Sequence, residues 1–272
     1  MKRPLGGSTV LITGAGSGIG RLLALGAAGR GARVVLWDLD GPAAERVAGE
    51  IAAAQPTGTA LAQVVDVTDA QAVRTAAAEA EAAIGPVDVV VNNAGVVSGK
   101  RLTEATDEQI RRTYEVNALA PYWVTRAVLP GMLERRRGLV VTIASLAGMV
   151  GVAQQTDYAG SKHAAVGFTE SLRNELRELG SPVGTLLVCP YYIDTGMFAG
   201  VRSRFSRVLP ILQPDDVATR VLDAIESGRE RLVLPGHVVP ALAARALPVR
   251  LGDAALRALG VQSSMRGFTG RR

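Results

Sequence analysis

Short runs of β-branched and other apolar residues alternate with longer segments rich in Ala, Leu, Glu and Arg along most of this chain. Strands that are buried on both faces of a sheet read as continuous runs of Val, Ile and Leu, and a helical crossover between two such strands forces them to pair in parallel. The alternation therefore predicts an α/β fold, a doubly wound seven-stranded parallel sheet with helices on both faces. The expected strands span residues 9–13, 33–38, 61–66, 87–92, 139–144, 183–189 and 231–234.

No linker, repeat or low-complexity segment divides the 272 residues. Because 48% of them are apolar, the chain can bury a large core, and α/β folds of this length often form one unit. We therefore predict a single domain over residues 1–272, with a substrate loop at 195–213 and a basic, apolar tail at 236–272.

The composition excludes several classes of function. One cysteine, Cys189, and two histidines can form neither an intrachain disulfide nor a metal site built from Cys or His ligands, so no metal is expected. The formal net charge of +5 arises from arginines that are concentrated after residue 228, in the tail rather than in a groove across the body. This distribution does not favour nucleic-acid binding, which needs a clustered basic face.

The ends of the chain bear on its location. Met1–Pro4 is basic, but no apolar stretch follows it, so we expect neither a signal peptide nor an N-terminal anchor, and hence a cytoplasmic protein. The uncharged stretch Gly138–Thr156 is long enough to span a bilayer, but its polar residues predict a buried strand and a loop. The tail carries spaced arginines and could make peripheral contact with an anionic membrane; packing over the substrate cleft or at a subunit interface is the favoured alternative.

The sequence TGAGSGIG at 13–20 follows the first expected strand and opens the first expected helix. Without side chains the backbone can approach a pyrophosphate group, whose charge is stabilised at a helix N-terminus. This strand–turn–helix context indicates a Rossmann-type nucleotide-binding fold rather than a packing turn. The residues expected to hold the nucleotide here are Gly14, Ser17, Gly18, Ile19 and Gly20.

Asp38 ends the second expected strand, at the position where such folds recognise the adenosine ribose. A carboxylate there can accept hydrogen bonds from the ribose hydroxyls and would repel a 2′-phosphate, so NAD is preferred over NADP. The alternative is an aspartate that only caps the next turn. Further residues expected at the cofactor follow the third and fourth strands: Asp66, Val67, Asn93, Ala94 and Gly95. Asn and Gly in this group fit an ordinary turn equally well.

Tyr158 and Lys162 are spaced to share one face of an expected helix. A phenol is a poor acid or base at neutral pH because its pKa is near ~10, and a nearby ammonium stabilises the phenolate and lowers that pKa. Ser145, which follows the fifth expected strand, could hydrogen-bond a substrate oxygen. A Tyr–Lys pair alone is usually a surface contact, but its combination with Ser145 and the glycine turn favours a catalytic site.

Together these motifs resemble the short-chain dehydrogenase/reductase family. The matching pieces, in the expected order, are TGAGSGIG at 13–20, Asp66, NNAG at 92–95, Asn117, Ser145 and YAGSK at 158–162. The resemblance implies that Tyr158 is the catalytic acid/base and that Lys162 holds the ribose and lowers the tyrosine pKa. It implies that Ser145 orients the substrate and that Asn117 supports a water-linked proton relay. It also implies contact with the nicotinamide carboxamide by Pro190, Ile193 and Thr195.

A narrower resemblance links VVLWDLD, CPYYIDTGMF and the ending LGVQSSMRGFTGR to the branch that holds retinol and 17-beta-hydroxysteroid dehydrogenases. With two loops rich in apolar side chains, it implies hydride transfer between NAD(H) and an apolar alcohol, aldehyde or ketone of retinoid, steroid or long-chain type. It also implies a homodimer or homotetramer. The alternatives are an NADPH-dependent ketoreductase of acyl or polyketide-type carbonyls and a non-catalytic nucleotide-binding protein.

Overall fold

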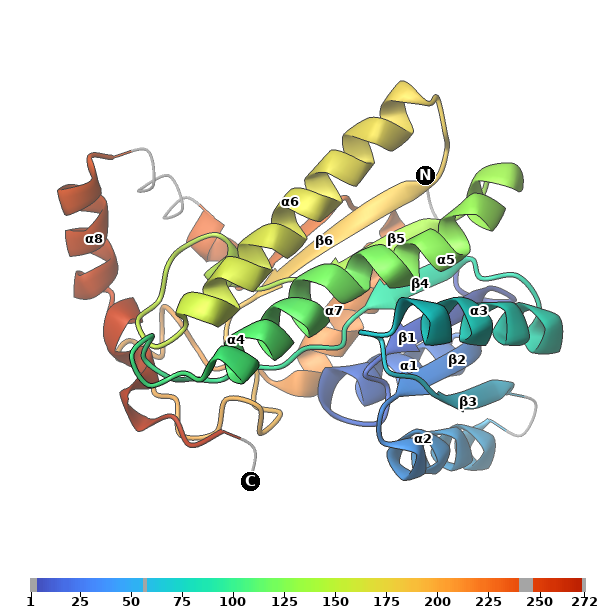
Figure 1. Ribbon diagram of the computed structural model, residues 1–272, viewed down its shortest axis with the longest axis horizontal. Helices are drawn as coiled ribbons and strands as arrows, with labels where there is room; N and C mark the ends of the chain where they lie inside the picture. The colour runs from blue at the N-terminus through green and yellow to red at the C-terminus, as the bar shows by residue number, and fades with distance from the viewer. Residues whose placement is uncertain (1–3, 56–57, 240–246, 271–272) are drawn as a thin grey trace.

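The computed structural model of the protein describes residues 4–55, 58–239 and 247–270 (Figure 1). The strands are β1 Thr9–Thr13, β2 Arg33–Asp38, β3 Ala60–Val64, β4 Val89–Asn92, β5 Leu139–Ile143, β6 Gly184–Pro190 and β7 Arg231–Leu234. The helices are α1 Gly18–Gly29, α2 Gly41–Ala54, α3 Ala70–Ile84, α4 Asp107–Tyr114, η1 Glu115–Leu119, α5 Ala120–Glu134, η2 Leu146–Gly148, α6 Thr156–Glu178, α7 Pro214–Ser227, α8 Val249–Ala258 and η4 Val261–Gly267.

All seven strands pair in parallel, in the order β3-β2-β1-β4-β5-β6-β7. The predicted doubly wound sheet is confirmed. The order reverses between β1 and β4, since the chain moves outward to β3 and then returns to the other side of β1. Ligands of such sheets bind in the crevice outside the carboxyl ends of the strands at this switch point.

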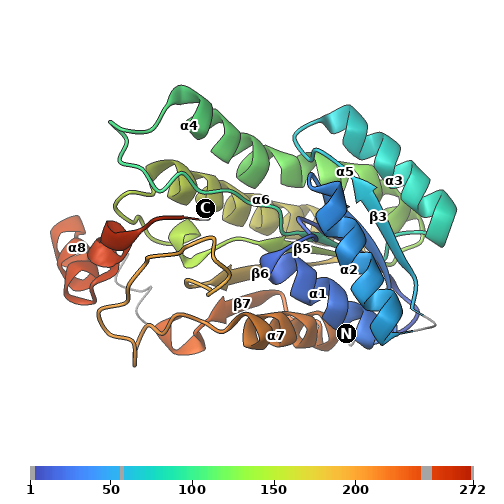
Figure 2. The same cartoon turned by 90° about the horizontal axis from the view of Figure 1, so that it is seen from below.

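Helices cover both faces of the sheet. In Figure 2, α3, α5 and α6 lie on one side of it and α1, α2 and α7 on the other. Successive strand residues point to opposite faces, so Val10 packs with the α1, α2 and α7 side whereas Leu11 packs with the α3, α5 and α6 side. The central strands β1, β4 and β5 are therefore buried along their whole length, which is why the sequence shows continuous rather than alternating apolar runs there.

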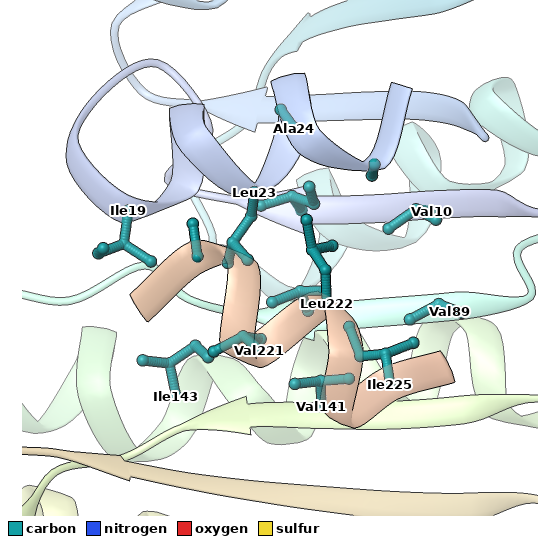
Figure 3. Packing of buried hydrophobic residues seen from close by; sticks show 14 of the residues in the cluster. Val10, Ile19, Leu23, Ala24, Val89, Val141, Ile143, Val221, Leu222 and Ile225 are labelled. Carbon is teal, nitrogen blue, oxygen red and sulfur yellow. The ribbon is translucent and has the colours of Figure 1, made fainter. Parts of the chain in front are cut away.

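Helices α1 and α7 pack closely against each other. Leu23 of α1 and Leu222 of α7 are buried together against the sheet residues Val10, Val89 and Val141 (Figure 3). The helices can approach because α1 carries Gly26: a Cβ atom at that position would lie 2.5 Å from Cδ1 of Leu222. This packing fixes α1, and with it the glycine turn that precedes the helix.

The segment expected as one long helix over 107–134, interrupted near Pro121, consists of three parts. α4 and α5 are joined by η1, a π-helical turn, in which the N–H of Ala120 bonds to the carbonyl of Glu115. Pro121 has no N–H to donate, so the ordinary helical bond at this point is lost in any case. The turn places Asn117 on the side of the helix that faces β4 and α6.

The uncharged stretch 138–156 forms β5, the turn η2 and a loop, as predicted. Among the residues that the structure describes, no helix is long and apolar enough to cross a membrane. Within the tail, α8 and η4 lie beyond the carboxyl edge of the sheet, and the chain after α8 turns back toward α6 (Figure 2). Residues 240–246 of the tail, with Arg245, lie outside the described residues.

Candidate active site

A cleft with a volume of about 450 Å³ runs along the carboxyl ends of the strands. All of the predicted site residues except Gly20 and Asn117 line it. These are Gly14, Ser17, Gly18, Ile19, Asp38, Asp66, Val67, Asn93, Ala94, Gly95, Ser145, Tyr158, Lys162, Pro190, Ile193 and Thr195. Residues that are far apart in the sequence thus come together at the switch point of the sheet.

The glycine turn leaves room for a phosphate-bearing ligand. Gly14 and Gly18 have φ angles of 64° and 54°, which favour glycine, and they bend the chain from β1 into the N-terminus of α1. A Cβ atom on Gly16 would lie 2.7 Å from Cβ of Ala43 and 2.9 Å from Oδ2 of Asp38. These features form a cradle of backbone at a helix N-terminus, which suits the pyrophosphate of a dinucleotide.

Gly20 has a packing role. A Cβ atom there would lie 2.0 Å from the carbonyl oxygen of Gly14 and 2.6 Å from Nδ2 of Asn93. The missing side chain therefore allows α1 to sit directly against the turn rather than making room for a ligand. The prediction placed Gly20 at the nucleotide, but it lies beneath the turn, out of the cleft.

Thr13 and Asn93 join the ends of β1 and β4. The Thr13 hydroxyl accepts from the N–H groups of Asn93 and Ala94, both at 3.0 Å. In return, Nδ2 of Asn93 donates to the carbonyl oxygens of Thr13 at 2.8 Å and Gly14 at 3.2 Å. Sequence reasoning missed Thr13, although its place as the first residue of the glycine motif was a usable signal. Asn93 both lines the cleft and holds the turn.

Asp38 supports two turns of the backbone at the edge of the cleft. Its Oδ2 accepts from the N–H of Gly16 at 2.8 Å, and its Oδ1 accepts from the N–H of Asp40 at 3.0 Å. The carboxylate also lines the cleft, next to Leu39. It thus fixes the glycine turn and presents a carboxylate to the cleft.

Tyr158 is buried at the cleft. Its ring meets the ring of Phe198 edge to face, with the ring centres 5.6 Å apart and an interplanar angle of 81°. Burial raises the pKa of the Tyr158 phenol above its ordinary value, and a hydrogen bond with Ser145 offsets part of this shift. Ser145 also accepts from the N–H of Ala147 at 3.1 Å, which orients its hydroxyl.

Lys162 lies one helical turn beyond Tyr158 and is only 4% exposed. Its Nζ donates to the carbonyl oxygen of Ile143 at 2.9 Å and lies 5.8 Å from the centre of the Tyr158 ring. Burial lowers the pKa of Lys162 to about 8. The sequence predicts that Lys162 lowers the tyrosine pKa, but in the protein without its cofactor desolvation dominates at both groups.

Asn117 lies behind the cleft rather than in its wall. Its Oδ1 accepts from the N–H of Val96 at 2.9 Å, and its Nδ2 donates to the Val96 carbonyl oxygen at 2.8 Å. The same Nδ2 also donates to the hydroxyl of Ser161 at 3.0 Å. Asn117 therefore clamps the loop after β4 to α6, next to the catalytic candidates.

The far end of the cleft is apolar. The loop after β6, within the predicted substrate loop 195–213, contributes Met197, Phe198 and Leu209. Phe205 and Ile211 of the same loop are instead exposed, and Leu212 packs into the core between the sheet and α7. The tail packs over the cleft, one of the two arrangements favoured for it from the sequence, and supplies the lining residues Val238, Leu256, Leu259 and Val261.

Comparisons with known proteins agree with this geometry. The family model "short chain dehydrogenase" matches residues 8–205. The chain is 39% identical over 235 residues to Short-chain dehydrogenase/reductase family 16C member 6 of Bos taurus, covering 86% of this chain and 74% of that protein. It is 36% identical to Epidermal retinol dehydrogenase 2 of Mus musculus, with 100% and 88% covered. It is also 36% identical to human 17-beta-hydroxysteroid dehydrogenase 13, with 87% and 78% covered.

Solved structures extend the similarity to the whole sheet. A short-chain dehydrogenase/reductase from Burkholderia phymatum in complex with NAD has a TM-score of 0.82 and 29% identity, covering 92% of this chain and 96% of that one. A metagenomic short-chain oxidoreductase in complex with NADP has a TM-score of 0.71 and 33% identity, covering 85% and 98%. The chain therefore belongs to the short-chain dehydrogenase/reductase family, near its retinol and steroid dehydrogenase branch, and is an NAD(P)-dependent oxidoreductase that acts on alcohols.

Proposed function

We propose that the protein catalyses the reversible, NAD(H)-dependent oxidation of a hydroxyl group on an apolar alcohol, through Ser145, Tyr158, Lys162 and Asn117. One observation carries this proposal: a single cleft brings a buried phenol and a buried ammonium together between a glycine turn and an apolar wall. Buried ionisable groups with shifted pKa values are typical of catalytic sites.

Tyr158 acts as the acid/base. In the oxidative direction its phenolate takes the proton from the substrate hydroxyl, and in the reductive direction the phenol returns it. The bound nicotinamide supplies the hydride chemistry. Ser145, already hydrogen-bonded to Tyr158, holds the substrate oxygen so that two hydroxyl groups fix its position.

Lys162 and Asn117 support Tyr158 from behind. Lys162 binds the ribose and stabilises the phenolate by its charge. Asn117 holds the Val96 segment to α6, and we assign to it the support of a water-linked proton relay from Lys162. Neither residue needs to touch the substrate for these roles.

For the cofactor we propose NAD in preference to NADP. The Asp38 carboxylate lies in the cleft and can accept hydrogen bonds from the ribose hydroxyls, whereas a 2′-phosphate there would meet its charge. Neither Ser17 nor Leu39 supplies a cation that could neutralise such a phosphate. One of the similar solved structures contains NAD and the other NADP, so the proposed preference for NAD rests on the Asp38 carboxylate.

For the substrate we propose a retinoid, steroid or long-chain alcohol, or the matching aldehyde or ketone. The support is the aliphatic and aromatic lining beyond Ser145 and Tyr158, together with relatives that are named retinol dehydrogenases and 17-beta-hydroxysteroid dehydrogenases. Apolar pockets with few polar groups select apolar ligands that are oriented through one reactive oxygen.

A turnover screen tests the proposal. Retinoids, steroids and long-chain alcohols are assayed by absorbance of the reduced nicotinamide, with NAD and NADP side by side. We expect oxidation of at least one of these alcohols with a higher kcat/KM for NAD. Turnover confined to NADPH and acyl or polyketide-type ketones would support the alternative ketoreductase. Nucleotide binding without any turnover would support a non-catalytic role.

We further propose a cytoplasmic, single-domain protein that forms homodimers or homotetramers. The exposed apolar side chains of Tyr114, Leu119 and Tyr122 on α4, η1 and α5 support pairing with another copy. In the tail, Val249 and Leu251 are exposed and could contact an anionic membrane. Light scattering tests the subunit number, and liposome flotation of the wild type against Leu251→Glu tests the membrane contact.

A further inference from the structure

The segment Val261–Thr269 of the tail, called the clasp below, packs onto three loops at the carboxyl ends of the strands. Met265 and Ser264 are 1% and 2% exposed, as buried as the core of the sheet. Figure 2 shows this part of the chain returning from α8 toward α6. A terminal segment that is buried to this extent is bound to the site and does not merely cover it.

The clasp is hydrogen-bonded to the loop after β6. The N–H of Arg202 donates to the carbonyl oxygen of Ser264 at 3.1 Å, and the N–H of Thr269 donates to the carbonyl oxygen of Ala199 at 2.9 Å. Between these bonds the two backbones meet: a Cβ atom on Gly200 would lie 1.9 Å from the carbonyl oxygen of Gly267. The substrate loop therefore takes its shape against the clasp.

The clasp also binds the loop that leads from Ser145 into α6. Oε1 of Gln262 accepts from the N–H of Ala153 at 3.1 Å, and its Nε2 donates to the carbonyl oxygen of Gly151 at 3.2 Å. The Gln262 side chain thus binds one backbone N–H and one backbone carbonyl of a loop that has no neighbouring strand to pair with. The start of α6, and so the position of Tyr158, depends on this loop.

A buried polar chain connects the clasp to the first turn of α6. The Ser264 hydroxyl is 3.0 Å from the hydroxyl of Tyr192, and Nε2 of Gln155 donates to the same Tyr192 hydroxyl at 3.3 Å. Nε2 of Gln155 also contacts Sδ of Met265 at 3.0 Å. The carbonyl oxygen of Gln155 accepts from the N–H of Ala159, next to Tyr158. Hydrogen bonds in such a buried environment are stronger than in water, so these contacts favour one arrangement of Gln155, Tyr192 and Ser264.

Aromatic rings form a second connection. Phe268 lies 6.4 Å, centre to centre, from Phe198, whose ring in turn meets the Tyr158 ring edge to face. On its other side Phe268 lies against Gly99 in the loop after β4, where a Cβ atom would come within 2.0 Å of the ring. Phe198 is therefore held between the catalytic ring and the clasp.

We infer that the clasp is a positioning element of the active site: through Phe268 and the Gln155–Tyr192–Ser264 chain it holds Phe198 and the start of α6 so that Tyr158 meets the substrate oxygen without surrounding water. This inference rests on the proposed function, because it assigns the clasp a role in the reaction of Tyr158. The hydrogen bonds and ring contacts of the clasp reach the loops after β4, β5 and β6 rather than the glycine turn, so we expect nucleotide binding to persist when these contacts are weakened.

Three variants and one control test the inference. Phe268→Ala removes the ring that supports Phe198, and Phe268→Leu keeps most of its apolar volume. Tyr192→Phe removes only the hydroxyl at the centre of the polar chain. Arg266→Ala is the matched control, because Arg266 belongs to the same segment but is exposed.

We expect Phe268→Ala to lower kcat at least tenfold and Tyr192→Phe at least threefold, with the dissociation constant for NAD unchanged within twofold. Phe268→Leu should recover most of the activity, and Arg266→Ala should match the wild type. Water that enters beside Tyr158 should also shift the pH profile of kcat to lower pH in Phe268→Ala. Wild-type kcat and pH profile in Phe268→Ala and Tyr192→Phe would overturn the inference.

Amide hydrogen exchange tests the inference about the clasp independently of the proposed function, because the measurement needs no substrate. In Phe268→Ala we expect faster exchange in residues 149–155 and 196–202, with α1 and the glycine turn unchanged. If the wild type oxidises no alcohol, the proposed function fails while this comparison still tests the clasp. Unchanged exchange in both loops would show that the clasp does not hold them.

Discussion

The ammonium nitrogen of Lys162 lies 5.8 Å from the centre of the Tyr158 ring, one helical turn along α6. Both groups are buried, and burial favours the neutral form of each: it raises the pKa of Tyr158 and lowers the pKa of Lys162 to about 8. The protein alone thus keeps Tyr158 as a neutral phenol. In the proposed mechanism, the phenolate needed for oxidation is stabilised further by the positively charged nicotinamide.

Replacing Lys162 by Met should change the pH dependence of stability. The unfolded chain carries Lys162 with a pKa of 10.5 and the folded chain with a pKa of about 8, so between these values the unfolded state binds more protons. The wild type therefore gains stability as the pH rises through this window, and Lys162→Met lacks that gain. We expect the free energy of unfolding of the wild type, relative to Lys162→Met, to increase by about 2–3 kcal/mol between pH 7 and pH 10.

Urea unfolding of both proteins at several pH values measures this difference. Tyr158 has the opposite effect on stability. Its pKa is raised in the folded protein, so the free energy of unfolding falls as the pH rises above ~10. That effect is present in both proteins and cancels in the comparison. A difference that stays constant from pH 7 to pH 10 would mean that Lys162 is not desolvated as the structure indicates.

The fold and most of the cleft could be predicted because they depend on local signals. Continuous apolar runs specify parallel strands, and the glycines at 14, 16 and 18 follow directly from the need for backbone close to a helix N-terminus. The residues missed by this reasoning act over long distances in sequence. Thr13 bonds across to Asn93, and the clasp meets loops more than sixty residues away in the chain. No local pattern specifies such contacts.

The relation between Tyr158 and Lys162 shows a second limit. Their spacing predicts a shared helix face, which the structure confirms. It does not reveal how deeply the pair is buried, and burial decides the direction of both pKa shifts. The burial of Tyr158 depends on side chains from other loops, such as Phe198 and Val97, and no local pattern in the sequence shows that they meet this ring.

Asp38→Asn should shift cofactor use toward NADP. The amide oxygen can still accept from the N–H of Gly16, so the turn keeps its support, while the negative charge facing a 2′-phosphate is lost. We expect the ratio of kcat/KM for NADP to that for NAD to rise at least ~10-fold, as removal of one close charge repulsion allows. Asp40→Asn, which removes a charge two residues away at the cap of α2, is the control and should change this ratio less than ~3-fold.

Gly26→Ala should destabilise the protein although alanine is the better helix former. The helix propensity gain of ~1 kcal/mol is outweighed by the overlap of the new Cβ with Leu222, which costs about 1–3 kcal/mol in a well-packed core. In a Leu222→Ala background the overlap is gone, so Gly26→Ala should then stabilise. Denaturant unfolding of the wild type, the two single variants and the double variant gives the coupling free energy between positions 26 and 222. Equal effects of Gly26→Ala in both backgrounds would show that α1 and α7 do not meet at this point.

The most direct test of the account is Tyr158→Phe, which removes one hydroxyl and keeps the ring against Phe198. The measurement is kcat on the best alcohol from the screen, together with NAD binding by isothermal titration calorimetry. We predict that kcat falls about 1000-fold, within the range of general acid–base catalysis, while the dissociation constant for NAD stays within twofold of the wild-type value. A variant that binds NAD and retains more than about a tenth of the wild-type kcat would contradict the role of Tyr158 as the acid/base.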